Sequence, residues 1–251
     1  MNAEEIFLFS SLILAVIIGA GVVQVLNKRG MQSIKILLAF SGGFLLSISF
    51  IHLIPEIYHI HSESIGIYIL IGFLLQLILE YFSRGGEHGH FHVNTKNIFP
   101  LGVFISLSIH SFLEGIPLER ELHHTAVDQE FLSHDHGEHA LYLGVLFHKI
   151  PVAIALMTLF VKAEIPSLKR WVAIFIFSLM APAGAIIAHY FGESIFGENM
   201  HASLDAILAV VIGMLLHVGT TIIFETSDSH KFNAVKLISI IVGVVIAIVL
   251  H

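Results

Sequence analysis

Long runs of apolar residues alternate with short polar segments along the whole chain. A helix needs about twenty consecutive apolar residues to cross the hydrocarbon core of a bilayer. Runs of that kind predict membrane-spanning helices at residues 6–26, 35–54, 65–82, 98–118, 139–161, 171–191, 203–224 and 234–250. The pattern therefore predicts an all-α integral membrane protein with eight transmembrane helices, formed as a single transmembrane domain over residues 1–251 with short connections.

The composition narrows the possible functions. Hydrophobic residues make up 56 % of the chain and charged residues 12 %, about half the charged share of a soluble domain, and the mean hydropathy is +0.88. A net charge of −7 without any basic stripe argues against nucleic-acid binding. Because the chain has no Cys, a soft or borderline metal must be held by imidazole and carboxylate, so the 18 His residues are the feature that needs an explanation.

Positive charge indicates the orientation of the helices. Lys28 and Arg29 follow the first apolar run instead of preceding it, so that run is expected to remain as a span and not to act as a cleaved signal. If alternate connections are assigned to the cytoplasm, only Arg120 lies outside. Ten basic residues then lie inside: Lys28, Arg29, Lys35, Arg84, Lys96, Lys162, Lys169, Arg170, Lys231 and Lys236. This bias predicts that both termini are outside.

Ionisable residues lie deep within two of the predicted spans. His110 and Glu114 are one helical turn apart on the span 98–118, and His148 and Lys149 lie on the span 139–161. Counted from the outer end of each span, both imidazoles lie roughly 12 to 14 Å below the outer surface. Such residues are costly in lipid and need a partner or a function. His110, Glu114 and His148 are therefore the candidate metal ligands, and Lys149 needs a fixed internal partner such as Glu114.

Helix-breaking residues accompany these ligands. Pro151 removes the hydrogen bond to the carbonyl of Phe147, and Gly115 and Pro117 loosen the other helix above His110. Irregular backbone near the midplane is a means by which transporters build a binding site. The kinks therefore favour passage of a cation.

The other histidines within or beside spans have simpler interpretations. His189 and His217 are expected to form hydrogen bonds between helices, with a place beside the metal pathway as the alternative for His217. His52, which precedes Glu56 near the outer end of the second span, is either interfacial or part of a pathway.

Two polar connections carry further histidines. Residues 119–138, outside by the charge argument, form an acidic loop expected to collect divalent cations. Residues 83–97 form a cytoplasmic His-rich loop expected to bind metal weakly. Ordinary solvated loops remain the alternative for both. The histidines concerned are His88, His90, His92, His123, His124, His134 and His136.

Taken in order, these motifs resemble the ZIP (zinc-regulated and iron-regulated transporter-like) family, over nearly the whole chain. The helix 4 pattern His-Asn-x-x-(Asp or Glu)-Gly is matched by residues 110–115, and the helix 5 pattern (His or Gln)-acid-x-Pro by residues 148–151. The helix 2 pattern His-x-x-Pro-(Asp or Glu) is matched by residues 52–56, and the helix 6 Pro-x-Gly begins at Pro182, a further kink residue.

The resemblance implies a 3+2+3 arrangement of inverted repeats, both termini outside, and alternating access. The sequence itself shows no clear echo between the repeats. It also implies a metal path lined by helices 4 and 5. The departures from the family pattern are Ser111, Lys149, Val152, Ala153 and Ala181. Because these positions largely hold a second metal in members with two, we expect one transport site, with the Lys149 ammonium in place of the second ion. Water or a helix 2 hydroxyl such as Ser47 or Ser49 would complete the shell.

Zinc uptake into the cytoplasm is the favoured function, with Fe²⁺, Mn²⁺, Cd²⁺, Co²⁺ or Ni²⁺ as other candidate substrates and no organic cofactor. The alternatives are an intramembrane zinc-dependent hydrolase of lipid amide or ester bonds and a metal exporter of another fold. The expected location is a bacterial inner membrane, with the lipid bilayer and divalent ions as partners and no nucleic acid. The small-residue face at Ser41-Gly42-Gly43 permits close packing within or between protomers, which leaves a homodimer open.

Overall fold

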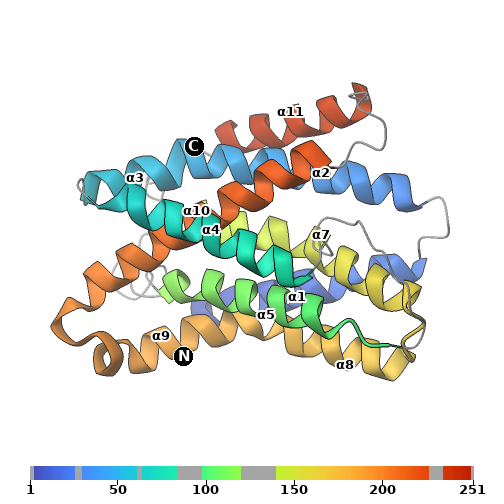
Figure 1. Cartoon of the computed structure of the whole chain (residues 1–251), viewed down its shortest axis with the longest axis horizontal. Helices are drawn as coiled ribbons and strands as arrows, with labels where there is room; N and C mark the ends of the chain where they lie inside the picture. The colour runs from blue at the N-terminus through green and yellow to red at the C-terminus, as the bar shows by residue number, and fades with distance from the viewer. Residues whose placement is uncertain are drawn as a thin grey trace.

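The computed structural model describes residues 3–25, 30–60, 64–83, 98–119, 140–225 and 234–249, and these residues are almost entirely helical (Figure 1). The helices are α1 (Ala3–Val25), α2 (Gly30–Ile48), α3 (Ile54–Ile60), α4 (Ile65–Ser83), α5 (Leu101–Gly115), α7 (Ala140–Lys162), α8 (Ser167–Ser178), α9 (Met180–Phe196), α10 (Met200–Glu225) and α11 (Ala234–Val249). Shorter turns of helix are η1 (Ser49–Leu53), η3 (Ile116–Leu118) and η4 (Gly197–Asn199). The all-α prediction is confirmed for these ranges.

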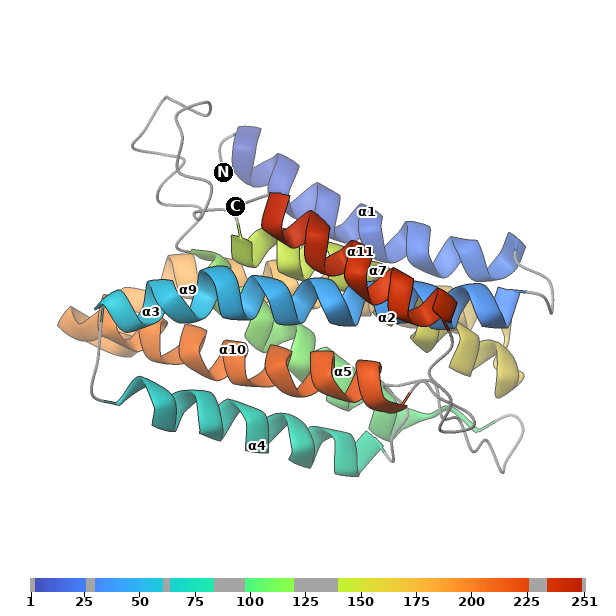
Figure 2. The same cartoon turned by 90° about the horizontal axis from the view of Figure 1, so that it is seen from above.

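All eight predicted spans correspond to helices of the described chain. Seven helical stretches are long and apolar enough to cross a membrane, while α11 is equally apolar but has only 16 residues. The chain enters α1 and leaves α11 toward the same end of the molecule (Figure 2), as an even number of crossings requires. His88, His90, His92, His123, His124, His134 and His136 lie outside the described residues, so both loop interpretations remain predictions.

The second span continues six residues beyond its expected end at residue 54, because a π-helical turn carries it past a proline. Pro55 has no N–H to donate to the carbonyl of Ile51, and its ring crowds that carbonyl. The turn η1 widens the helix there, and the N–H of Ile54 donates to the carbonyl of Ser49, five residues back. His52 lies within this widened turn and is buried. π-Helical turns of this kind occur often at functional sites.

The sixth span is divided into α8 and α9 at Leu179. Pro182 has no N–H to donate to the carbonyl of Ser178, and the regular helical hydrogen bonding is interrupted at the next residue, Leu179. The N–H of Leu179 bonds to the carbonyl of Ile176 at 3.2 Å, and α9 starts afresh with Ala183 bonded to Leu179 at 2.8 Å. The kink predicted at Pro182 is thus a break in the helix.

The helices pack in two groups (Figure 1). One group contains α2, α4, α10 and α11, and the other contains α1, α5, α7, α8 and α9. The main seams between them are the α2–α7 and α4–α5 contacts. Each group contains helices from both ends of the sequence. The groups therefore do not coincide with the two expected repeats, which are the first three and the last three membrane spans.

Glycines repeat the same close contact in two places within the first group. Gly43 of α2 meets Gly243 of α11, and Gly72 of α4 meets Gly213 of α10. In both pairs, a Cβ atom on either glycine would overlap the carbonyl oxygen of the residue three positions before the other glycine. The second and eighth spans (α2 and α11) therefore pack as the seventh and third spans (α10 and α4) do. This similarity between the first three and the last three spans was not visible in the sequence alone.

Candidate metal centre

Helices α5 and α7 bring three potential metal ligands together inside the protein. His110 and Glu114 lie on one face of α5, and His148 faces them from α7; the three side chains are buried, and one ligand atom from each lies within 4.8 Å of the others. Nε2 of His110 lies 2.8 Å from Oε1 of Glu114. The imidazoles of His110 and His148 meet edge to face, with ring centroids 5.9 Å apart. The structure therefore gathers the three residues that depth and spacing selected from the sequence.

Two glycines set the position of α5 against α9. A side chain on Gly115 would overlap the carbonyl of Ala181, and one on Gly184 would overlap the carbonyl of Phe112. Gly115 itself has ordinary helical angles (φ −72°, ψ −31°), so its role here is close packing, and the change to a 3-10 turn comes at Ile116–Leu118 with Pro117. Pro151 lies inside α7, which continues as a helix on both sides of it.

Lys149 is buried beside the three potential ligands. Its Nζ contacts Oε2 of Glu114 and donates to Oγ of Ser111 at 2.9 Å. The ring of Phe177 lies 5.8 Å from the same nitrogen. The ammonium thus has the internal partner that its depth required. One carboxylate oxygen of Glu114 faces His110 while the other faces Lys149.

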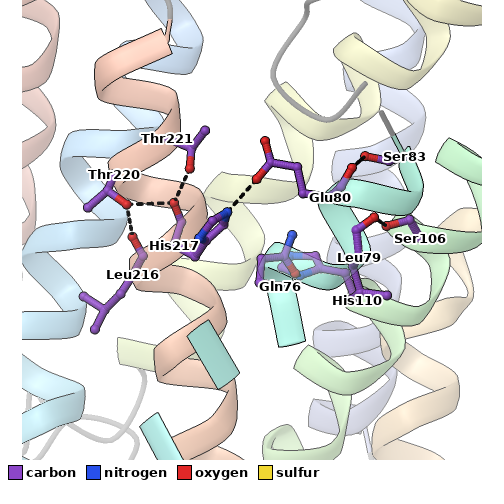
Figure 3. Close-up of polar contacts among 10 residues, drawn as sticks. All are labelled: Gln76, Leu79, Glu80, Ser83, Ser106, His110, Leu216, His217, Thr220 and Thr221. Atoms are coloured by element: carbon purple, nitrogen blue, oxygen red, sulfur yellow. Dashed lines mark hydrogen bonds and ion pairs between the residues drawn. The ribbon is translucent and has the colours of Figure 1, made fainter. Parts of the chain in front are cut away.

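Two polar residues of α4, Gln76 and Glu80, contact histidines and were not predicted as candidate residues from the sequence. Oε1 of Gln76 lies 2.8 Å from Nδ1 of His110, and Oε2 of Glu80 lies 2.6 Å from Nε2 of His217 (Figure 3). A usable signal was present, because Gln76 and Glu80 are one turn apart in an otherwise apolar span. The same criterion had identified His110 and Glu114.

The remaining candidate residues lie elsewhere. His217 joins α10 to α4, as expected of a hydrogen bond between helices, and His189 of α9 lies 3.7 Å from Glu119. Within the described ranges, His52, Glu56 and His217 are not part of the three-ligand group. Ser47 is buried on α2, while Glu56 is exposed on α3.

Comparison with known proteins adds an independent finding. A family model described as ZIP Zinc transporter matches residues 83–251, which is more than half of the chain. Protein zntD of Dictyostelium discoideum is 28 % identical over 169 residues, covering 61 % of this chain and 22 % of zntD. The chain thus spans about a fifth of the length of this curated relative.

Proposed function

Because the chain belongs to the ZIP family of zinc transporters, we propose that it carries divalent metal ions, foremost Zn²⁺, across a membrane through His110, Glu114 and His148. The supporting observation is the convergence of two imidazoles and one carboxylate, all buried, with ligand atoms within 4.8 Å of one another. The family consists of transporters and not enzymes, which argues against the intramembrane hydrolase.

The donor set suits a transported ion. Zinc accepts imidazole nitrogen and carboxylate oxygen, and three protein ligands leave a fourth position open for water or a hydroxyl such as that of Ser47 or Ser49. An open position allows ligands to be exchanged one at a time as the ion arrives and leaves. Because nitrogen and oxygen ligands select by geometry and availability, Fe²⁺, Mn²⁺, Cd²⁺, Co²⁺ and Ni²⁺ are the competitors to test.

We propose that the site holds a single ion. The Lys149 ammonium contacts the Glu114 carboxylate and the Ser111 hydroxyl. Lys149 stands where the family pattern has an acid, and Ser111 stands where it has an Asn. A second divalent ion at that place would be repelled by a fixed positive charge in surroundings of low dielectric constant.

The direction proposed is uptake, by alternating access between the two helix groups, in a chain with both termini outside. The distribution of basic residues and the acidic composition of residues 119–138 support this orientation. The repeated glycine contacts support a duplicated architecture of the kind on which alternating access is built. The small-residue face at Ser41–Gly43 is used within the chain and offers no surface for a homodimer, because Gly42 packs against α10 and Gly43 packs against α11.

Radiolabelled zinc influx into proteoliposomes tests the proposal. His110→Ala should abolish saturable influx, whereas His59→Ala, a matched change at an exposed position of α3, should leave it intact. Competing divalent ions added in turn would define the substrate range. Zinc bound at His110 without flux under any gradient would contradict transport.

A further inference from the structure

Contacts recur at regular intervals along the seam between α4 and α5. They use every fourth residue of α5 and every third residue of α4, as expected for two antiparallel helices in continuous contact. At one end Gly102 lies against the carbonyl of Phe82. Next, the Ser106 hydroxyl donates to the carbonyl of Leu79 at 2.7 Å, and then His110 is bonded to Gln76 at 2.8 Å; Figure 3 shows these two contacts. The last contact differs from the others because it contains a proposed metal ligand.

Both ring nitrogens of His110 have neighbours. Nδ1 faces Oε1 of Gln76, and Nε2 faces Oε1 of Glu114 at 2.8 Å. His110 is 2 % exposed and Gln76 is completely buried, so their hydrogen bond is shielded from bulk water. Nε2 is the nitrogen on the side of Glu114, where the three ligand atoms converge. A metal ion bound there takes the lone pair of Nε2, which requires the ring proton to be on Nδ1.

We infer that Gln76 is a positioning residue for the transported ion. Its side-chain carbonyl accepts the Nδ1–H of His110, which fixes the tautomer and the ring angle and presents Nε2 to the ion. Gln76 itself does not bind the metal. Partners of this kind orient histidine ligands in many metal sites, where their loss costs about 10- to 100-fold in affinity. This inference rests on the proposed function, because it assigns Gln76 a role only if His110 binds the cargo.

The positions of the two residues give this bond a second consequence. Gln76 belongs to the group of α2, α4, α10 and α11, whereas His110 belongs to the group of α1, α5, α7, α8 and α9. A movement of one group past the other must break their hydrogen bond. The orientation of His110, and with it the affinity for the ion, therefore depends on the relative position of the groups.

Cobalt binding tests the inference directly, since the visible spectrum of Co²⁺ reports both its affinity and its coordination. The protein is the full chain with the seven loop histidines replaced by Gln, so that binding by the two His-rich loops does not contribute. Gln76→Leu should weaken Co²⁺ binding about 10- to 100-fold. Gln76→Glu keeps an acceptor oxygen at the same distance along the side chain and should retain the affinity. Ser106→Ala is the matched control, because it removes a hydrogen bond of the same seam without touching His110.

The outcomes separate this inference from the proposed function. If Gln76→Leu and Ser106→Ala lose equal Co²⁺ affinity, or if Gln76→Leu loses none, the role of Gln76 is overturned. The site itself stands in either case if His110→Ala loses Co²⁺ affinity. Unchanged cobalt binding in His110→Ala would overturn the site itself. If Gln76→Leu fails to fold, ¹⁵N NMR of the zinc-loaded wild type decides the matter: a protonated Nδ1 and a metal-bound Nε2 on His110 are expected, and the reverse would contradict the inference.

Discussion

Two of the histidine–glutamate contacts among the described residues, one on α5 and one between α4 and α10, differ in what surrounds them. His110 and Glu114 are 2.8 Å apart on α5, next to His148 and Lys149 of α7. His217 and Glu80 are 2.6 Å apart and join α10 to α4 within one helix group. Of these two contacts, only the first belongs to a group of three convergent His or acid side chains in the part of the chain that the structure describes.

The difference shows that residue type alone does not mark a transport site. A His and a Glu that face each other across two helices satisfy one another and stabilise a helix contact. A His and a Glu on one helix, met by a second imidazole and an ammonium from the next helix, form a set whose charges are arranged around a common point. Changes made in parallel at the two places should separate these roles.

Removing the carboxylate should have the largest effect and the largest contrast. Glu114→Ala leaves the buried Lys149 ammonium without its ion partner and should reduce the free energy of unfolding by about 3 to 5 kcal/mol. Glu80→Ala leaves an imidazole that can stay neutral, so its cost should be about 1 to 3 kcal/mol. Unfolding of the metal-free proteins in mixed micelles measures both. Glu114→Leu combined with Lys149→Met should recover most of the loss, and equal costs for the two single changes would contradict the difference.

Removing the imidazole of His110 should weaken zinc binding, whereas removing that of His217 should not. His110→Ala deletes a proposed ligand and should weaken zinc binding by more than the roughly 10- to 100-fold expected for an outer partner. His217→Ala should leave zinc affinity at the intramembrane site unchanged while lowering stability. Zinc titration of protein lacking the loop histidines provides the measurement. A comparable loss of affinity in His217→Ala would mean that the second contact also holds the ion.

The pH should affect zinc binding and the second contact differently. Protons compete with a metal ion for imidazole nitrogen, so zinc affinity should decrease as the pH falls. The contact between His217 and Glu80 contains no proposed metal ligand, so this competition does not act on it. Zinc binding and thermal stability, measured across the same pH series without and with metal, should therefore diverge. Zinc affinity independent of pH would contradict imidazole ligation.

Loss of the hydroxyl beside Lys149 should cost less than loss of the Glu114 carboxylate. Ser111→Ala removes one of the two acceptors of the ammonium and should lower stability by about 1.5 to 3 kcal/mol, at the upper end if no water replaces the hydroxyl. The hydroxyl of Thr220 bonds to carbonyls of its own helix at 2.8 and 2.9 Å, so Thr220→Ala should change stability by a few tenths of a kcal/mol. The same unfolding assay compares them, and equal effects would mean that Ser111 does not support Lys149.

Much of the fold could be predicted because lipid imposes strict rules on a sequence. Apolar length located all eight spans, and depth counted along two of them placed His110 level with His148, on consecutive spans that the structure brings together. The breaks were harder to predict. Pro55 and Pro182 are visible in the sequence, but whether a proline kinks, widens or divides a helix depends on the hydrogen bonds available to neighbouring carbonyls. One case produced a π turn and the other two separate helices.

What the sequence did not predict depends on contacts between helices distant in the chain. Gln76 and Glu80 are visible as polar residues of an apolar span, but their partners, His110 and His217, are fixed only when α4 packs against α5 and α10. The four glycines that repeat one contact likewise carry no local signal, because their role is defined by a carbonyl on another helix. Gly115 was interpreted as a loosening residue for the same reason, since its close approach to Ala181 requires α9 to be in place.

The stoichiometry and coordination of bound zinc test the proposed site most directly. In purified protein lacking the loop histidines, titration should find one tightly bound ion per chain. X-ray absorption should show two imidazole nitrogens at about 2.0 to 2.1 Å and one carboxylate oxygen in its coordination shell. His110→Ala should remove that ion. Two tightly bound ions within the membrane helices, or one ion whose spectrum does not change in His110→Ala, would contradict a single site formed by His110, Glu114 and His148.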